Sequence, residues 1–191
     1  FLGSLSIGKD VFGSTFWTTS GNNYEIFRGQ AILENSVVTT KGGDFAGNMY
    51  ETVNNNSYGV IGGQAKLVHT ESFTTNTNVD DSESRTWSIS NYEYTDGTET
   101  IEELQGLNIE NPEIYINPET GLAFVGLLKT VYAEEEGVTI TDYKGVQREF
   151  SGIGSLTVGK DIFGNTFWAI SENRYKINKG QSFVETAVTT T

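Results

Sequence analysis

A repeated stretch of 38 residues most constrains how this chain can fold. Residues 3–40 match residues 154–191 at a constant offset of 151 and without a gap, and 21 of the 38 positions are identical. The opening "GSLSIGKDVFGSTFW" returns as "GSLTVGKDIFGNTFW". Chance does not produce this match, so we expect the same β-meander at both ends of the chain. We find no second copy of residues 41–153 and expect that region to be unique.

Two domain organisations follow from the repeat. In one, residues 1–153 form a β-rich repeat unit and residues 154–191 begin the next unit of a tandem array. In the other, residues 154–191 are strands that complete the same domain. The match is still good where the second copy stops, and the sequence begins at Phe1 rather than at Met. We therefore favour the array, and expect a processed protein or a piece of a longer one.

The residue usage favours β-strands. Phe, Tyr and Gly are abundant, with 11, 9 and 22 residues, and there are only two Pro. About a dozen short aromatic or β-branched runs are separated by Gly or Asn, as in strands joined by tight turns. The single helix candidate is residues 99–107, and Asp96-Gly97 is a strong hairpin signal. The sequence predicts an all-β fold: an antiparallel β-sandwich or barrel with meander and hairpin connections and at most one short helix.

Charge and composition exclude several partners. The formal net charge of −13 argues against nucleic acid and anionic membranes, and no apolar run is long enough for a membrane helix. The absence of Cys removes disulfides and thiolate metal sites. An acidic, Cys-free, Thr-, Asn- and Gly-rich β chain that repeats at a domain-sized period resembles, in composition, bacterial extracellular repeat proteins such as adhesins and surface-layer or filament subunits. That resemblance implies an extracellular or cell-surface location.

The repeated motif "GKDxFGxTFW" is the main candidate for an assembly element. Gly8 and Gly13 are expected to bracket a tight loop in which Phe12 turns inward. Phe16 and Trp17 are adjacent in a strand and must point to opposite faces, so something has to cover whichever ring lies outside the core. A second sheet, a neighbouring repeat or a sugar ring would do so. The residues that we assign to assembly are Lys9, Asp10, Phe16, Lys160, Asp161 and Phe167.

Two candidate ligand sites compete with that interpretation. A lectin-like or small-ligand β-barrel would line its site with Trp17, Trp87 and Trp168, with carbohydrate as the candidate partner. The acidic loop "NVDDSES" offers calcium four oxygen ligands in a spacing that does not match an EF-hand. These calcium candidates are Asn78, Asp80, Asp81 and Glu83, and we predict no other cofactor.

The sequence gives little support to catalysis. His69 is the only histidine, so a zinc site with two histidines is excluded, and we interpret it as a half-exposed strand residue. The acidic pairs at residues 80–83, 102–103 and 134–136 lie in polar segments, where solvation is their ordinary role. A Lys–Asn isopeptide bond is a minor hypothesis for Lys9, Lys66, Lys129 and Lys160. We expect no enzyme, but a secreted or cell-surface structural or adhesive module that assembles by strand pairing and domain stacking with itself or with neighbouring repeats.

Overall fold

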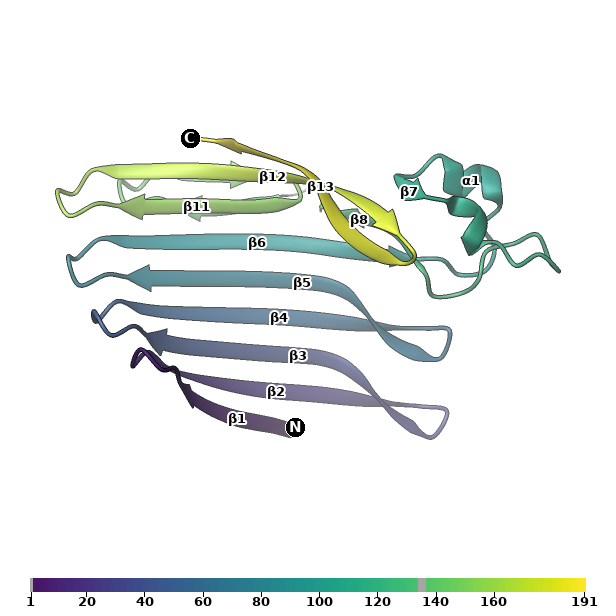
Figure 1. Ribbon diagram of the computed structural model, residues 1–191, viewed down its shortest axis with the longest axis horizontal. Helices are drawn as coiled ribbons and strands as arrows, with labels where there is room; N and C mark the ends of the chain where they lie inside the picture. Colours follow the sequence, from purple (N-terminus) through teal and green to yellow (C-terminus); the bar gives the residue numbers. More distant parts are fainter. Residues whose placement is uncertain (1, 134–136) are drawn as a thin grey trace.

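The computed structural model describes residues 2–133 and 137–191. It contains one α-helix, one 3-10 helix and a large antiparallel sheet (Figure 1). The elements in chain order are β1 (Leu2–Lys9), β2 (Thr15–Phe27), β3 (Gln30–Gly43), β4 (Met49–Ile61), β5 (Gln64–Thr77), β6 (Glu83–Tyr94), α1 (Ile101–Gln105), β7 (Ile109–Glu110), η1 (Pro112–Tyr115), β8 (Leu128–Tyr132), β9 (Val138–Thr141), β10 (Gln147–Phe150), β11 (Gly154–Lys160), β12 (Thr166–Asn178) and β13 (Gln181–Thr190).

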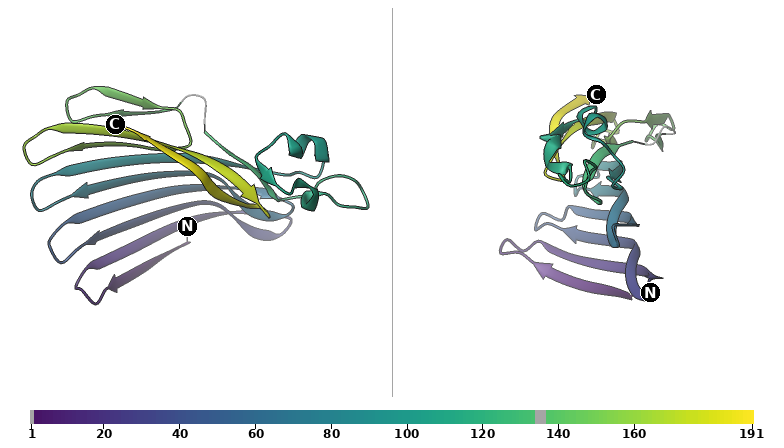
Figure 2. Two further views of the ribbon diagram at one scale, coloured as in Figure 1. Left: turned by 45° about the horizontal axis from the view of Figure 1, so that its top comes forward. Right: turned by 90° about the vertical axis from the view of Figure 1, so that its right-hand side faces the viewer.

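The predicted all-β class, meander order and single short helix are confirmed. The main sheet runs β1-β2-β3-β4-β5-β6-β11-β12-β13, with β8 beside β6 and the two-residue β7 parallel to β12. β1 and β13 form the two ends of this path, so the sheet is open. The β9–β10 hairpin forms a second, small sheet, and a two-layer arrangement is confined to the C-terminal half. Figure 2 shows the N-terminal strands as a single layer.

A 34-residue hairpin repeat, which the sequence analysis missed, underlies the single layer. Our expectation that residues 41–153 contain no copy was therefore wrong. The loops that begin at Asp10, Asp44 and Asn78 have the same hydrogen bonds, each residue donating its amide to the carbonyl four residues later. The matched positions, each 34 residues apart, include Thr18/Thr52/Thr86, Tyr24/Tyr58/Tyr92, Gly29/Gly63/Gly97, Gln30/Gln64 and Thr40/Thr74.

The opposite ends of these hairpins are two-residue turns with positive φ at both positions. Arg28-Gly29 has φ of 51° and 81°, Gly62-Gly63 has 60° and 78°, and Lys179-Gly180 has 49° and 75°. Positive φ at both central residues matches the strand twist of a type I′ hairpin turn, which explains the glycines. A register shift precedes Tyr24, Tyr58 and Tyr175 in the same place of each hairpin. Such bulges increase local twist and bend the strands.

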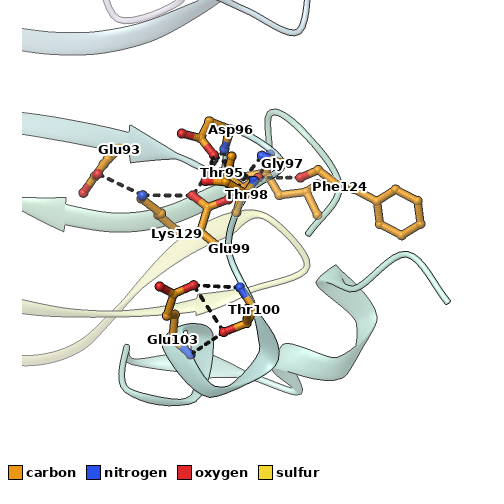
Figure 3. A network of polar contacts seen from close by, with 11 residues as sticks. Glu93, Thr95, Asp96, Gly97, Thr98, Glu99, Thr100, Glu103, Phe124 and Lys129 are labelled. Carbon is orange, nitrogen blue, oxygen red and sulfur yellow. Dashed lines mark hydrogen bonds and ion pairs between the residues drawn. The ribbon is translucent and has the colours of Figure 1, made fainter. Parts of the chain in front are cut away.

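The third hairpin does not close. Asp96-Gly97 lies where the first two hairpins turn, but the chain leaves the sheet there and returns only at β8, so the predicted simple hairpin was wrong. The exit and the return are joined at Thr95, whose side chain is fully buried. The Thr95 hydroxyl donates to the Phe124 carbonyl at 2.6 Å and accepts from the Leu127 amide at 3.0 Å (Figure 3). The predicted helix lies in this excursion, and Thr100 and Glu103 form its capping box.

The same polar network holds Lys129 between two carboxylates. Its ammonium lies 2.9 Å from Glu93 Oε1 and 3.0 Å from Glu99 Oε1, as Figure 3 shows. Glu99 also accepts hydrogen bonds from the backbone amides of Asp96 and Gly97. Burial of Glu99 opposes its ionisation, but the ammonium and the amides prevail and lower its pKa. The network thus fixes residues 95–127 to the end of the sheet.

Side-chain ladders support the part of the sheet that has no second layer. One face of the sheet carries a row of hydroxyl side chains across the strands, and we call it the Thr face. The row consists of Ser6, Thr18, Thr40, Thr52, Thr74, Thr86 and Thr157. Within this row, hydroxyls of adjacent strands form hydrogen bonds between β2 and β3 at 3.0 Å, between β4 and β5 at 3.0 Å, and between β6 and β11 at 2.9 Å. In the next row on this face, three glycines each lie under an aromatic ring of the neighbouring strand, in the pairs Gly8/Phe16, Gly42/Tyr50 and Gly159/Phe167. Cross-strand pairs of these kinds stabilise a sheet without a second layer.

Candidate functional site

The second meander, β11–β13 at residues 154–190, is covered by the segment before it. We call residues 83–153 the covering segment. Its β6 pairs with the whole of β11, from Gly154 opposite Ile89 to Lys160 opposite Glu83. Its β9–β10 hairpin packs over the sheet face that carries the tryptophans, which we call the Trp face. That cluster contains Val138, Ile140, Phe150, Leu156 and Val158, with Trp87, Ile89, Trp168 and Ile170 against it.

The rest of the covering segment holds the far end of the second meander. Ile177 of β12 is 2 % exposed and packs in a cluster with Leu104, Ile109 and Tyr115. Backbone and side-chain hydrogen bonds fix this contact. They run from the Ile177 amide to the Asn108 carbonyl at 2.9 Å, from Asn108 Nδ2 to the Tyr175 carbonyl at 2.7 Å, and from the Gly180 amide to the Tyr115 hydroxyl at 2.7 Å.

The first meander, β1–β3 at residues 2–43, has the same motif but no cover among the described residues. Leu5, Ile7 and Ile26 are 64 %, 76 % and 74 % exposed. The matching residues of the second meander, Leu156, Val158 and Ile177, are 0 %, 1 % and 2 % exposed. The two meanders therefore differ in their surroundings and not in their internal pairing, since β1 pairs with β2 in the register that β11 keeps with β12. Leu5 and Ile7 are neighbours on one face of β1, with the half-exposed Trp17 opposite Ile7, and exposed apolar patches of this kind mark interaction sites.

Both ends of the sheet are open edges within the part of the chain that the structure describes. β1 pairs only with β2, and β13 pairs only with β12. The matching strands elsewhere have neighbours on both sides, because β11 lies between β6 and β12, and β3 lies between β2 and β4. Open edges present unpaired backbone groups that another strand can bind. The candidate assembly surface consists of these edges and the exposed apolar side chains of the first meander.

The charged residues predicted to act in assembly lie either in the loops between strands or at the ends of β1 and β11. Asp10 and Asp161 close their loops, and Oδ1 of each accepts the amides two and four residues later at 2.8–2.9 Å. The pKa of Asp161 is lowered, mainly because the side-chain amide of Asn165 donates a hydrogen bond to its carboxylate. Lys160 lies 3.5 Å from Glu83 across the edge of the covering segment, whereas Lys9 is exposed on the free edge.

The orientations predicted for the aromatic side chains of the motif are correct for Phe16 and Trp17 and wrong for Phe12. Phe16 and Trp17 do lie on opposite faces, Phe16 over Gly8 on the Thr face and Trp17 on the other. Phe167 repeats the position of Phe16. The inward orientation predicted for Phe12 is wrong, because its side chain is 78 % exposed. The loop is closed by the Asp10 carboxylate and by Gly13 at a φ of 96°, so no ring is needed inside it.

The three tryptophans share one face but do not form one site. Trp87 and Trp168 lie in the cluster under the β9–β10 hairpin, and the Arg148 guanidinium stacks 5.1 Å from the centre of the Trp168 ring. Trp17 is 40 % exposed on β2, four strands from β6, which corresponds to about 19 Å at the usual strand spacing. A cavity of about 380 Å³ adjoins Trp87, and its lining includes Glu71, Phe73, Arg85 and Ile140.

Three of the calcium candidates lie in the loop of the third 34-residue repeat, and Glu83 is the first residue of β6. Asn78 and Asp81 occupy the positions of Asp10 and Gly13 in the first loop. Asp80 Oδ1 accepts from the Ser82 amide and hydroxyl, and Glu83 lies near Lys160. No group of three or more His, Asp or Glu residues suited to a metal occurs in the described parts of the chain. The calcium site therefore stays a prediction.

The remaining chemical candidates are dispersed. His69 Nδ1 lies 2.7 Å from Asn91 Oδ1 on the neighbouring strand. Glu103 caps α1, and the acidic run 134–136 lies outside the described residues. Of the lysines proposed for an isopeptide bond, Lys129 is held by two glutamates rather than by an asparagine.

Comparison with known protein families, curated proteins and solved structures finds no match for this chain. Within the described residues, no helix has the length and apolar character to span a membrane.

Proposed function

We propose that this chain is a structural or adhesive β-repeat module, secreted or displayed on a cell surface, which assembles by strand pairing and domain stacking in a tandem array or filament. The observation that carries the proposal is the difference in burial between matching residues of the two meanders. Leu5 and Ile7 are exposed where Leu156 and Val158 are buried. A surface that this fold buries once and leaves bare once is suited to receive another copy.

The open edges support the same function. β1 and β13 each lack one of the two neighbours that β11 and β3 have in the described structure. Addition of a strand at such an edge uses main-chain hydrogen bonds for affinity and side-chain pockets for specificity. The net charge of −13 opposes indiscriminate association. Selective pairing at the edges, with repulsion elsewhere, is the property that an ordered array requires.

Self-association of the native chain tests the proposal. Light scattering over a wide range of concentration is expected to show growth into oligomers, and Ile7→Lys with Val184→Lys is expected to abolish it by placing charge at β1 and β13. Val11→Lys is the matched control, because Val11 is 93 % exposed but lies in a loop outside both edge strands. A native chain that stays monomeric at all concentrations and salt levels would overturn assembly between molecules.

A lectin-like module is the second candidate, favoured by the cavity of about 380 Å³ beside Trp87. Phe73 and Trp87 offer apolar surface there, and Glu71 and Arg85 offer polar groups. That combination is typical of small-ligand sites. Titration of the native chain with a panel of neutral oligosaccharides tests this candidate by tryptophan fluorescence. A spectral change that Phe73→Ala removes, and that Phe163→Ala leaves intact, would support carbohydrate binding in place of assembly.

A further inference from the structure

The second meander shows in detail what a covered first meander would look like. We propose that residues 2–43 form the docking surface for the covering segment, the equivalent of residues 83–153, of a second copy of this unit that precedes it in tandem. This inference rests on the proposed function and identifies its partner. In the structure the covering segment leads directly from residue 153 into Gly154, which matches Gly3. A preceding copy would therefore enter β1 without a linker.

The strand edge and the apolar contacts carry over to the first meander. Backbone pairing with β6 depends little on side chains, and the eight residues of β1 include matches for all seven residues of β11. Leu156 and Val158, which lie under the β9–β10 hairpin, become Leu5 and Ile7. Docking would thus bury two large apolar side chains that are otherwise mostly in water, the main source of favourable free energy in such contacts.

Polar contacts at the rim carry over as well. Lys160, which faces Glu83, is matched by Lys9. Asn108 Nδ2 donates to the Tyr175 carbonyl and to Glu185 Oε2, and the first meander has Tyr24 and Glu34 at those positions. The buried Ile177 is matched by Ile26, which is 74 % exposed. The docking surface therefore retains the residues that contact Glu83 and Asn108 in the second meander.

Three contacts do not carry over, and one of them provides a sensitive test. Ile170 of the apolar cluster is matched by Thr19, and Asn178, whose Nδ2 donates to Glu110 Oε2 at 2.8 Å, is matched by Phe27. Lys176 lies 3.6 Å from Glu110, but the first meander has Glu25 in its place. In a docked arrangement Glu25 would face Glu110 of the preceding copy, and like charges at such positions repel. Replacement of Glu25 by Lys would restore the pair. The substitution should therefore strengthen docking while having little effect on a unit whose first meander is bare.

A tandem chain of residues 1–153 followed directly by residues 3–191 tests the inference, since each unit keeps its native sequence. In hydrogen exchange, the amides of the second unit's β1 are expected to be protected at least tenfold more than those of the first unit's β1. Ile7→Asp in the second unit is expected to lower the melting temperature. The same change in the first unit is the internal control, because Ile7 is 76 % exposed in the absence of a preceding copy.

The possible outcomes separate this inference from the proposed function. Equal exchange in both β1 strands, or equal effects of Ile7→Asp in both units, would overturn the docking site. Glu25→Lys in the second unit should raise the protection further, and a decrease would also count against the site. If the tandem chain docks while the native chain remains monomeric, the inference stands and assembly between separate molecules fails. If the native chain associates but the tandem units do not dock, assembly between separate molecules stands and the docking inference fails.

Discussion

Leu5 and Leu156 occupy the same position of a repeated β-meander, yet Leu5 is 64 % exposed and Leu156 is completely buried. Their strands have the same pairing with the following strand, with Leu5 opposite Thr19 and Leu156 opposite Ile170. The difference arises from the β6 edge and the β9–β10 hairpin, which lie only against Leu156. Burial at this position is therefore determined by the neighbouring segment and not by the meander itself.

The first prediction compares leucine truncation at these two sites. Leu156→Ala should lower the free energy of unfolding by about 2–5 kcal/mol, because it removes buried methyl groups and leaves a cavity. Leu5→Ala should change it by about 0.5 kcal/mol or less, as expected for an exposed site. Urea unfolding followed by circular dichroism measures both. Similar losses in the two variants would mean that Leu5 is buried in solution, and the bare first meander would then be wrong.

The sequence predicted local features well, because each depends on neighbouring residues. Alternation placed Phe16 and Trp17 on opposite faces, and the acidic start, the apolar spacing of Ile101 and Leu104, and Gly106 as a stop located the short helix within residues 99–107. The 34-residue repeat was missed because, apart from Gly29-Gln30-Ala31, which returns as Gly63-Gln64-Ala65, most of its matches between these two copies are isolated residues separated by substituted positions. Asp10, for example, is matched by Asn78, which keeps the loop geometry with an amide in place of the carboxylate.

The failed predictions depended on contacts that are distant in sequence. Asp96-Gly97 has the composition of a hairpin turn, but the Thr95 bonds to Phe124 and Leu127 divert the chain. Likewise, no local pattern distinguishes exposed Ile7 from buried Val158, since both lie in nearly the same sequence. The candidate assembly surface could be suspected from the repeat, but its location required knowing which copy is covered.

The second prediction concerns the ammonium of Lys129. Lys129→Met removes the donor that Glu99 contacts at 3.0 Å, and Glu99 is only 9 % exposed. A buried group left without its partner costs about 1–3 kcal/mol, so the variant should lose stability by that amount in chemical denaturation. Adding Glu99→Gln should restore part of the loss, because the only carboxylate then left without the ammonium is that of the exposed Glu93. Glu93→Gln is the control, since that carboxylate is 53 % exposed and should contribute about 1 kcal/mol or less.

The third prediction tests the glycine–aromatic pairs of the Thr face. The Phe167 ring lies directly over Gly159, where an added methyl group would overlap it. Phe167→Ala should expose this backbone and lower stability by about 0.5–1 kcal/mol, the range of a good cross-strand pair. Phe163→Ala is the matched control, because Phe163 belongs to the same hairpin but is 81 % exposed. If both alanine variants melt at the same temperature, the ring over Gly159 contributes nothing to the sheet.

The fourth prediction concerns acid, because the loop aspartates are bound as anions. Asp142 Oδ1 accepts the amides of Val146 and Lys144, each at 2.9 Å, and Arg148 Nε donates to Oδ2 at 3.2 Å. The Val146 amide is the main cause of a lowered pKa at Asp142. The pKa values of Asp10, Asp44, Asp80, Asp96 and Asp161 are also lowered.

A pKa that is lower in the folded state stabilises the fold at pH values above the unfolded pKa, which is about 3.9 for aspartate. The contribution is lost as the pH falls through the folded value. The melting temperature should therefore be nearly constant from neutral pH to about pH 5 and fall below about pH 4. Asp142→Asn, which keeps an acceptor for the amides but loses the charge, should be less stable than the native chain at pH 7. That difference should shrink steadily on acidification. Scanning calorimetry of both proteins across this range measures it, and a difference that persists undiminished in acid would show that the charge of Asp142 is not what stabilises the loop.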